Sequence, residues 1–215
     1  MLVVAKAPVA GFAKTRLTPP ATPRQAARIA AAALLDTLDA AHATGAPVVV
    51  AMTGQLAGAE RAGELRRALR TTTVLGQRGP TFADRLANAH SDAAAVDGGA
   101  TLQVGMDTPQ LTAELLADAA ARLSYVDAVL GPATDGGWWA LGLREPAVAD
   151  AIRTVPMSRS DTGERTLHAL RRNGLRVGLL AELSDVDTMA DATRVAGSCA
   201  GGRFRAAVQE VMVAA

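Results

Sequence analysis

The chain has 215 residues, of which 49% are apolar, so it is long enough to bury a core, and we expect one domain over residues 1–215. Its 22 Lys and Arg residues nearly balance its 21 Asp and Glu residues, and the net charge of +1 argues against a nucleic-acid partner. The lone Cys199 cannot form an internal disulfide, the first residues do not resemble a signal peptide, and no apolar run reaches the ~20 residues of a membrane span. We therefore predict a soluble, cytoplasmic protein without a membrane span.

Segments typical of strands and helices alternate along the chain. In order, we expect a strand at Leu2–Ala5, a helix from Thr22 to Gly45, a strand at Pro47–Thr53, a helix at Gly58–Leu69 and a strand at Thr71–Leu75. They are followed by a helix at Thr81–Val96, a strand at Ala100–Gly105, a helix at Thr112–Leu123 and a strand at Asp127–Leu130. The remaining elements are an edge or antiparallel strand in DGGWWALGLR, a helix at Asp161–Asn173, a strand at Arg176–Leu180, a helix capped by Thr188 with Asp191, and a helical tail from Gly201.

This alternation predicts an α/β fold, in which helices cover both faces of an open, mostly parallel sheet to give three layers. Ligands of such sheets bind at the carboxyl ends of the strands, so the loops after the strands are the places to look for chemistry. Four loops stand out, namely KAPVAGFAKTRL, GMDTP, GPATDGGWW and SDVDT. One is cationic and three carry carboxylates, which is the combination that a site for metal and phosphate requires.

The first of these loops is a candidate phosphate cradle. Gly11 allows the backbone to turn, and Lys14 and Arg16, two residues apart, can both reach one anion. The loop is not a Walker A motif, because Ala13 stands where that motif has Gly before the Lys. A solvated basic loop is the alternative, but its position directly after a first strand favours phosphate binding.

The acidic loops supply candidate metal ligands. Asp107 at a strand end can hold Mg²⁺ or Mn²⁺ together with water and substrate phosphates, although it can also be a simple turn residue. Asp187 is a candidate for a second metal, and we expect only one of Asp185 and Asp187 to face the cleft. Asp135 is either a general base for an acceptor hydroxyl or a turn residue.

The remaining aromatic and histidine residues are weaker candidates for a functional role. Trp138 or Trp139 offers a face on which a sugar or base can stack, and the other one is expected in the core. The three histidines have no metal-ligand spacing, and we interpret them as packing or surface residues. No Ser-His-Asp or Cys-His arrangement is visible, which argues against hydrolysis through an acyl-enzyme.

Taken together, AKAPVAGFAKTRL, GMDTPQL, GPATDGGWWALGL, NGLRV and LSDVDT resemble the rSAM/selenodomain-associated transferases, also described as arsenosugar-biosynthesis glycosyltransferase-like proteins. This resemblance covers nearly the whole chain and implies the GT-A fold of the nucleotide-diphospho-sugar transferases, a Rossmann-like sheet with the nucleotide over its N-terminal half. The KTRL and DVDT segments are more distantly similar to phospholactate guanylyltransferases and molybdenum-cofactor guanylyltransferases.

The resemblance also implies roles for individual residues. It places Lys6, Lys14 and Arg16 on the nucleotide phosphates, Asp107 on the divalent metal, Asp187 on a second metal or its shell, and Gln77 and Arg85 beside the nucleotide base. The chain departs from the family pattern at Met106, where Ser or Thr is usual, at Ala83-Asp84-Arg85 in place of Gly-Glu-Arg, and at Trp138-Trp139 in place of a Tyr-rich segment. The last departure leaves the identity of the acceptor open.

These observations lead to one preferred function and two alternatives. The first is a metal-dependent glycosyltransferase that uses a nucleotide sugar and a small-molecule acceptor, with Mg²⁺ or Mn²⁺ on the diphosphate. Here Lys14 and Arg16 would neutralise the leaving nucleoside diphosphate and Asp135 would accept the acceptor proton. The second is a nucleotidyltransferase in which an acceptor attacks the α-phosphate of an NTP and pyrophosphate leaves. The third is a non-catalytic nucleotide-binding protein, and a homodimer through the apolar helices is also possible.

Overall fold

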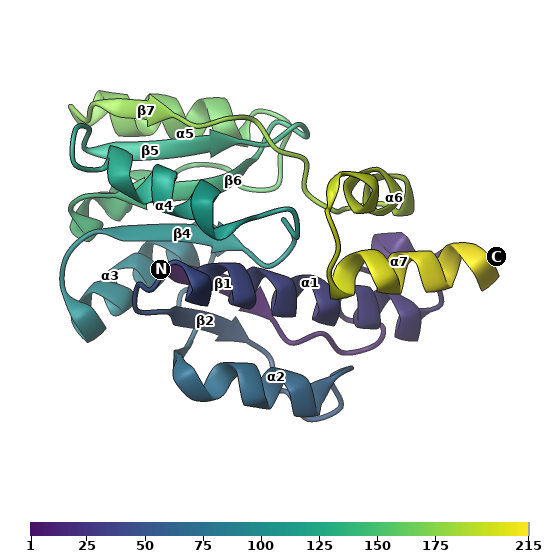
Figure 1. Cartoon of the computed structure of the whole chain (residues 1–215). Helices are drawn as coiled ribbons and strands as arrows, with labels where there is room; N and C mark the ends of the chain where they lie inside the picture. The colour runs from purple at the N-terminus through teal and green to yellow at the C-terminus, as the bar shows by residue number, and fades with distance from the viewer. Residues whose placement is uncertain (215) are drawn as a thin grey trace.

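A seven-stranded mixed sheet forms the centre of the structure, a computed structural model that describes residues 1–214 (Figure 1). The strands follow the order β3-β2-β1-β4-β6-β5-β7 across the sheet. Their bounds are β1 Leu2–Lys6, β2 Val49–Thr53, β3 Thr73–Gly76, β4 Thr101–Gly105, β5 Ala128–Pro132, β6 Trp138–Leu143 and β7 Val177–Leu179. Only β6 runs antiparallel to its neighbours, so the remaining strands all end at the same edge of the sheet.

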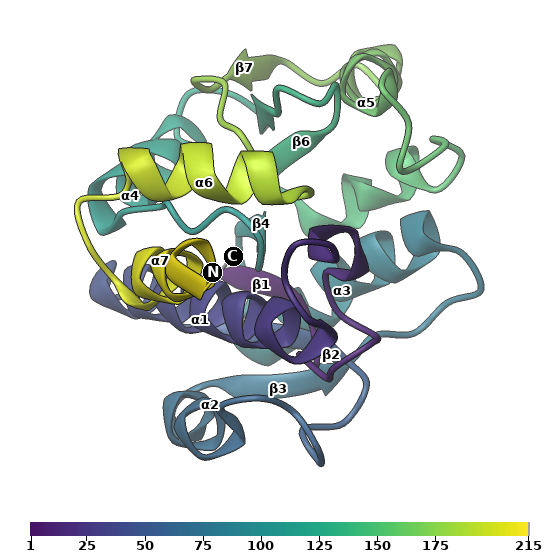
Figure 2. The ribbon, with the colours of Figure 1, turned by 90° about the vertical axis from the view of Figure 1, so that its right-hand side faces the viewer.

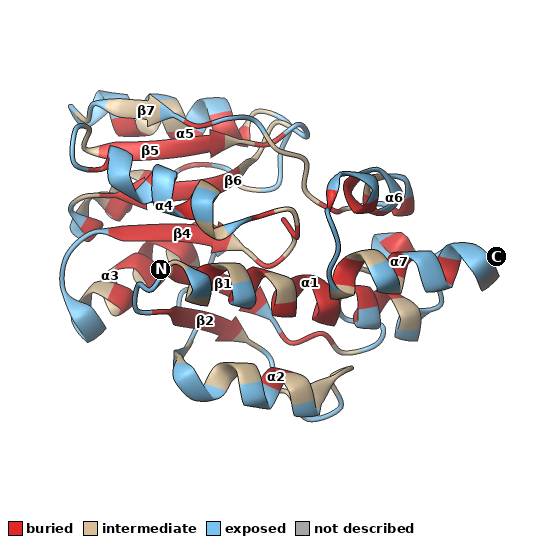
Figure 3. Cartoon of the chain, in the orientation of Figure 1, coloured by how far each residue is buried: buried red, intermediate tan, exposed pale blue. Residues whose placement is uncertain are grey.

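Helices cover both faces of this sheet. They are α1 Pro23–Ala43, α2 Ala62–Ala68, α3 Phe82–Asp97, α4 Ala113–Arg122, α5 Thr162–Arg172, α6 Met189–Ser198 and α7 Arg203–Ala214, with short 3-10 helices η1 Thr15–Leu17, η2 Leu69–Thr71 and η3 Pro146–Ile152. Helices α1, α2 and α4 pack on one face, whereas α3, η3 and α5 pack on the other. Within β1, Val3 faces the first group and Leu2 and Val4 face the second, as strand alternation requires. The five inner strands are almost entirely buried, whereas the edge strands β3 and β7 are partly exposed (Figure 3).

A third apolar cluster lies outside the two layers that flank the sheet. Helix α7 packs along the outer side of α1, and α6 packs beside α7 (Figure 2). Phe204 is the largest fully buried side chain of this cluster, which also includes Leu17 and Val186. No helix within residues 1–214 is both long enough and apolar enough to cross a lipid bilayer.

The expected helix starts are confirmed where a capping residue was available. Thr22, Thr81 and Thr188 each form a complete capping box, and each binds the backbone N–H of the residue three positions later. The expected helix start at Gly58 is wrong: α2 begins only at Ala62, because both Gly58 and Arg61 adopt left-handed backbone conformations that a helix cannot contain.

The sequence predicted an edge strand or an antiparallel strand after the Asp-Gly-Gly turn. The strand is antiparallel, but it is not at the edge of the sheet. It lies between β4 and β5 in the sheet. Ala140, Leu141 and Leu143 are fully buried there, which explains why this apolar segment occupies an interior position. The reversal brings the start of β6, and not its end, to the edge where the parallel strands finish.

Candidate functional site

A cleft of about 1030 Å³ opens at the edge of the sheet where the parallel strands end. All four loops singled out in the sequence contribute to it, through Lys14 and Arg16, Asp107, Asp135, and Asp185 and Asp187. The chain reversal at β6 adds the Asp-Gly-Gly turn to the loops that follow β1 and β4. The topology therefore brings together Lys14 and Asp187, which are 173 positions apart in the sequence.

The basic loop meets the acidic loops directly. Lys14, in the left-handed conformation, extends its Nζ to 2.9 Å from Asp107 Oδ2 and also donates to the carbonyl oxygen of Val186. Arg16 forms an ion pair with Asp187. Gly11 has a φ of 77° and shapes the turn before these residues, but it does not line the cleft. Two of the candidate phosphate-binding cations, Lys14 and Arg16, are thus paired with the candidate metal-binding carboxylates.

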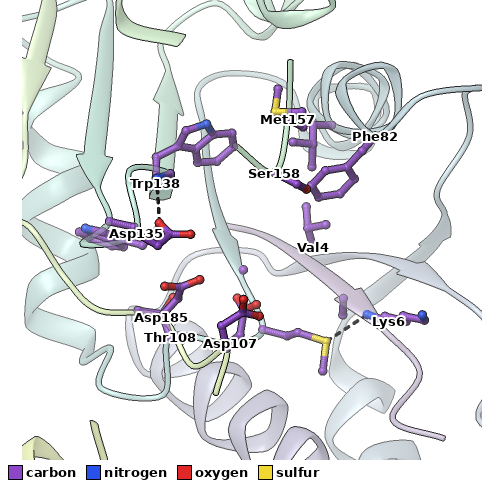
Figure 4. A pocket seen from close by; sticks show the side chains of 18 of the residues that line it. Val4, Lys6, Phe82, Asp107, Thr108, Asp135, Trp138, Met157, Ser158 and Asp185 are labelled. Carbon is purple, nitrogen blue, oxygen red and sulfur yellow. Dashed lines mark hydrogen bonds between the residues drawn. The ribbon is translucent and has the colours of Figure 1, made fainter. Parts of the chain in front are cut away.

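Asp185 is the most strongly perturbed carboxyl group of the cleft. Burial raises its pKa to about 6, and the nearby carboxylates of Asp135 and Asp107 add to the increase, while Lys14 opposes it. Asp135 itself accepts a hydrogen bond of 2.7 Å from the backbone N–H of Gly137, as a turn residue does. Figure 4 shows Asp107, Asp135 and Asp185 close together on one side of the cleft.

The expectation that only one of Asp185 and Asp187 faces the cleft is wrong, because both line it. Residues two positions apart in an extended segment point to the same side, and Val186 between them is buried on the opposite side. The Val186 N–H also donates to the carbonyl oxygen of Asp107 at 3.0 Å, which fixes the segment beside β4. Sequence reasoning thus missed Asp185, although correct use of strand alternation would have selected it together with Asp187.

The donor set fits a hard divalent cation that brings part of its own ligand shell. Among residues 1–214, no group of three or more His, Cys, Asp or Glu side chains forms a complete metal site. Asp107 and Asp185 nevertheless offer carboxylate oxygens, and the buried Thr108 next to Asp107 has an Oγ1 without a hydrogen-bond partner among these residues. Mg²⁺ and Mn²⁺ characteristically combine one or two carboxylates with water and substrate phosphates.

The residues expected beside the base line the same cleft but are partly engaged within the fold. Gln77 donates from Nε2 to the carbonyl oxygens of Ala5 and Ala51, both at 2.9 Å, and so joins the ends of β1 and β2. Only its Oε1 is left for a ligand. The Arg85 guanidinium lies 5.5 Å from the centre of the Phe82 ring, in a cation–π arrangement at the start of α3. Lys6 is exposed, while its backbone N–H donates to Met106 Sδ at 3.1 Å.

The expectation that one tryptophan packs in the core is confirmed for Trp139. Its side chain is buried, and its Nε1 donates to the carbonyl oxygen of Ala181 at 3.0 Å. Trp138 remains partly exposed in the cleft. Phe12 and Phe82 also line the cleft, and the sequence analysis did not select either of them.

Comparison with solved structures identifies the fold. A candidate nucleotide-diphospho-sugar transferase from Desulfovibrio desulfuricans G20 superposes with a TM-score of 0.86 at 23% identity, covering 99% of this chain and 95% of that one. Rv0371c from Mycobacterium tuberculosis H37Rv, in a complex with manganese, gives 0.50 at 19% identity, with 90% and 96% covered. CMP:2-keto-3-deoxy-manno-octonic acid synthetase complexed with CTP gives 0.55 at 11% identity, with 91% and 95% covered. The expected α/β fold of the nucleotide-diphospho-sugar transferases is confirmed.

The comparisons by sequence are narrower. No curated protein matches the chain. One family does match, over residues 35–159, a segment that runs from α1 to the loop before α5 and therefore contains Asp107, Asp135 and the cleft residues of α3, among them Phe82 and Arg85. The match spans more than half of the chain, which therefore belongs to DUF2064, the family described as uncharacterized proteins conserved in bacteria.

Proposed function

We propose that this protein is a metal-dependent glycosyltransferase that takes a nucleotide sugar as donor. The observation that carries the proposal is the pairing of Lys14 with Asp107 and of Arg16 with Asp187 across one cleft at the ends of the strands. A metal–diphosphate complex can replace both partners in these ion pairs. Its metal ion can bind the carboxylates, and its diphosphate oxygens can bind the Lys and Arg side chains. The similarity in fold to a candidate nucleotide-diphospho-sugar transferase supports this choice, as does the resemblance of the loop motifs to the rSAM/selenodomain-associated transferases.

Binding would then proceed by an exchange of ionic partners. Lys14 would leave Asp107, Arg16 would leave Asp187, and both cations would bind the diphosphate oxygens. The freed Asp107 would then hold Mg²⁺ or Mn²⁺ together with Asp185, with the freed Asp187 beside them. Lys6 at the rim would add a further cation, and Gln77 and Arg85 would lie on the side of the base. The structure of Rv0371c in complex with manganese supports the choice of a divalent cation. When bound, the ion would supply Lewis-acid stabilisation of the diphosphate charge.

The chain's own residues would assist the transfer step. The acceptor hydroxyl oxygen forms a bond to the anomeric carbon of the sugar, and the bond from that carbon to the diphosphate oxygen breaks with its electron pair. Lys14 and Arg16 would stabilise the negative charge that develops on this leaving oxygen. The hydroxyl proton would pass to Asp135, which lies beside Asp185 at the same end of the cleft.

Nucleotidyl transfer is the second candidate, and a specific observation favours it. The cleft contains four carboxylates, Asp107, Asp135, Asp185 and Asp187, which is enough to hold two metal ions for an in-line displacement at an NTP α-phosphate. In that reaction an acceptor oxygen bonds to the α-phosphorus and the bond to the bridging oxygen breaks, so that pyrophosphate leaves. The fold similarity to a synthetase that was crystallised with CTP supports this alternative.

A thermal-shift panel of NTPs, NDPs and nucleotide sugars, each with Mn²⁺, Mg²⁺ or chelator, tests the proposal. A ligand at 100 times its Kd adds about 2.7 kcal/mol to the free energy of unfolding. We expect a metal-dependent shift with a nucleotide sugar that is absent in Asp107→Asn and retained in Asp118→Asn, a control at an exposed position of α4. Stabilisation by an NTP alone would transfer the assignment to nucleotidyl transfer, and no shift with any nucleotide would refute both reactions.

A further inference from the structure

Half of the aromatic side chains of this chain open onto the cleft. The chain contains only six aromatic residues, namely three Phe, two Trp and one Tyr. Phe12, Phe82 and Trp138 are open to the cleft, whereas Trp139 and Phe204 are packed in the core. Phe12 is 69% exposed and Phe82 is 42% exposed, so neither ring is used to stabilise the core. Large apolar side chains that are left open to a cavity indicate that a ligand covers them.

One end of the cleft forms what we call the apolar chamber, on the face of the sheet that carries α3. Its wall consists of Val4, Phe82, Leu86, Gln103, Trp138 and Met157. Figure 4 shows Val4, Phe82 and Met157 gathered on one side of the cleft, with Trp138 pointing toward them from β6. The carboxylates of the metal and phosphate region lie on the opposite side. The two ends of the cleft therefore differ in chemistry.

The wall of the chamber contains one buried amide. Gln103 on β4 is 2% exposed and lines the cleft, while its Oε1 is buried in the interior. On the inner side it meets His90: burial lowers the pKa of His90, a hydrogen bond with the Gln103 side chain opposes this decrease, and His90 Nδ1 lies 2.6 Å from Thr101 Oγ1. An amide in an otherwise apolar wall can orient a ligand, because it can hydrogen-bond a polar substituent and cannot do so with a hydrocarbon.

The aromatic walls are held in place from outside the chamber. Phe82 is the first residue of α3, which the capping box of Thr81 and Asp84 fixes, and Arg85 stacks on its ring. Trp138 follows the Asp-Gly-Gly turn, against which the segment before α5 packs by direct backbone contact. The Gly163 N–H donates to the carbonyl oxygen of Gly136 at 2.8 Å across this contact. Rigid walls of this kind favour a rigid, planar or ring-shaped ligand.

We propose that the apolar chamber binds the acceptor, and that the acceptor is a small molecule with an aromatic or apolar ring that carries at least two polar substituents. The ring lies between Phe82 and Trp138, one substituent bonds to the Gln103 amide, and the reacting hydroxyl faces Asp135. This inference rests on the proposed function, since it takes the metal and phosphate end of the cleft to be the donor site.

Small diols probe this chamber in the intact protein. We expect resorcinol and cyclohexane-1,3-diol to shift the indole N–H signal of Trp138 in NMR titrations, and 1,3-propanediol, which has no ring, to leave it unchanged. Trp139 is the internal reference, because its N–H is bound to Ala181 in the core. Phe82→Ala should raise the Kd of both ring diols at least tenfold, and Gln103→Leu should raise it several-fold. Tyr125→Ala, which removes an exposed ring outside the cleft, should leave it unchanged.

The metal-dependent nucleotide shift separates this inference from the proposed function. Phe82→Ala also removes the ring on which Arg85 stacks, so we expect it to weaken nucleotide binding by clearly less than it weakens the binding of the ring diols. Equal binding of ring and ringless diols, alongside an intact nucleotide shift, would overturn the inference and leave the proposed function standing. If Phe82→Ala weakens nucleotide binding as much as it weakens diol binding, the chamber holds the nucleotide base and the inference is wrong.

Discussion

The ionised form of the Asp185 carboxyl group is disfavoured, and a bound cation would stabilise it. Its pKa is raised to about 6 by burial and by the charges of Asp135 and Asp107. The folded protein therefore binds the Asp185 proton more tightly than the unfolded chain does. Ionisation of Asp185 consequently lowers the free energy of unfolding as the pH rises. This loss is absent below the unfolded pKa of about 3.8 and complete above pH 6. We predict that Asp185→Asn raises the free energy of unfolding by about 1–2 kcal/mol at pH 8 and by much less at pH 4.5, measured by denaturant titration without metal.

The same variant should lose affinity for a metal–nucleotide complex, so stability and binding change in opposite directions. Asp187→Asn is the matched control, because this carboxylate is paired with Arg16 at the surface and its loss should change stability by less than about 0.5 kcal/mol. Equal pH dependence of the wild type and Asp185→Asn would show that Asp185 is not a destabilising charge.

The sequence was sufficient to select most of the charged residues of the cleft and its tryptophan, but not the phenylalanines. Loops after strands are where α/β sheets bind their ligands, and these loops contain Lys14, Arg16, Asp107 and Asp135. Phe82 stands at a helix start, where its exposure depends on the space above the sheet and cannot be predicted from local pattern. The scarcity of aromatic residues was the one available signal that each ring has a specific use.

At the scale of elements, the contact between the β5–β6 turn and the segment before α5 depends on two glycines. A Cβ on Gly136 would overlap the carbonyl oxygen of Ser160, and one on Gly163 would lie 2.5 Å from the carbonyl oxygen of Gly137. We predict that Gly136→Ala lowers the free energy of unfolding by about 2–4 kcal/mol, because it combines this overlap with a φ of 86°, and that it displaces Trp138 in the cleft. Thermal melts and the Trp138 indole signal would measure the two effects.

Gly197→Ala provides the contrast. Gly197 lies near the end of α6, where a Cβ would meet nothing within 4 Å, so this substitution should stabilise the protein by about 0.5 kcal/mol through helix propensity. A similar change in stability for both variants would mean that backbone contact at the turn is not what requires glycine at position 136.

The elements also mark the limit of what local sequence pattern can predict. Helix starts with a capping box were predictable because the signal is contained in four residues, as at Thr22 and Thr188. The interior position of β6 was not, because the order of strands in a sheet depends on long-range pairing that no local pattern encodes. The late start of α2 likewise depends on the left-handed conformation of Arg61. Arg has no preference for this conformation, so the sequence could not predict it.

At the scale of the whole molecule, the apolar cluster formed by α1, α6 and α7 connects the two C-terminal helices to the site. Leu17 follows Arg16 of the basic loop, and Val186 lies between the two carboxylates of the last loop; both pack in this cluster with Phe204. The two loops whose charges pair across the cleft are therefore anchored on the same apolar support, which is remote from the sheet.

We predict that Phe204→Ala lowers the free energy of unfolding by about 3–5 kcal/mol and also weakens metal-dependent nucleotide binding several-fold, although Phe204 does not line the cleft. The reason is that a cavity in the cluster that also contains Leu17 and Val186 is expected to loosen the spacing between Lys14 and Asp107. Met212→Ala, at a half-exposed position of the same helix, should change neither quantity by much. Both would be measured well below the melting temperature, so that the binding data report only folded protein. An unchanged nucleotide Kd in Phe204→Ala would mean that the C-terminal helices stabilise the fold without positioning the loops, and that the sheet alone sets the geometry of the cleft.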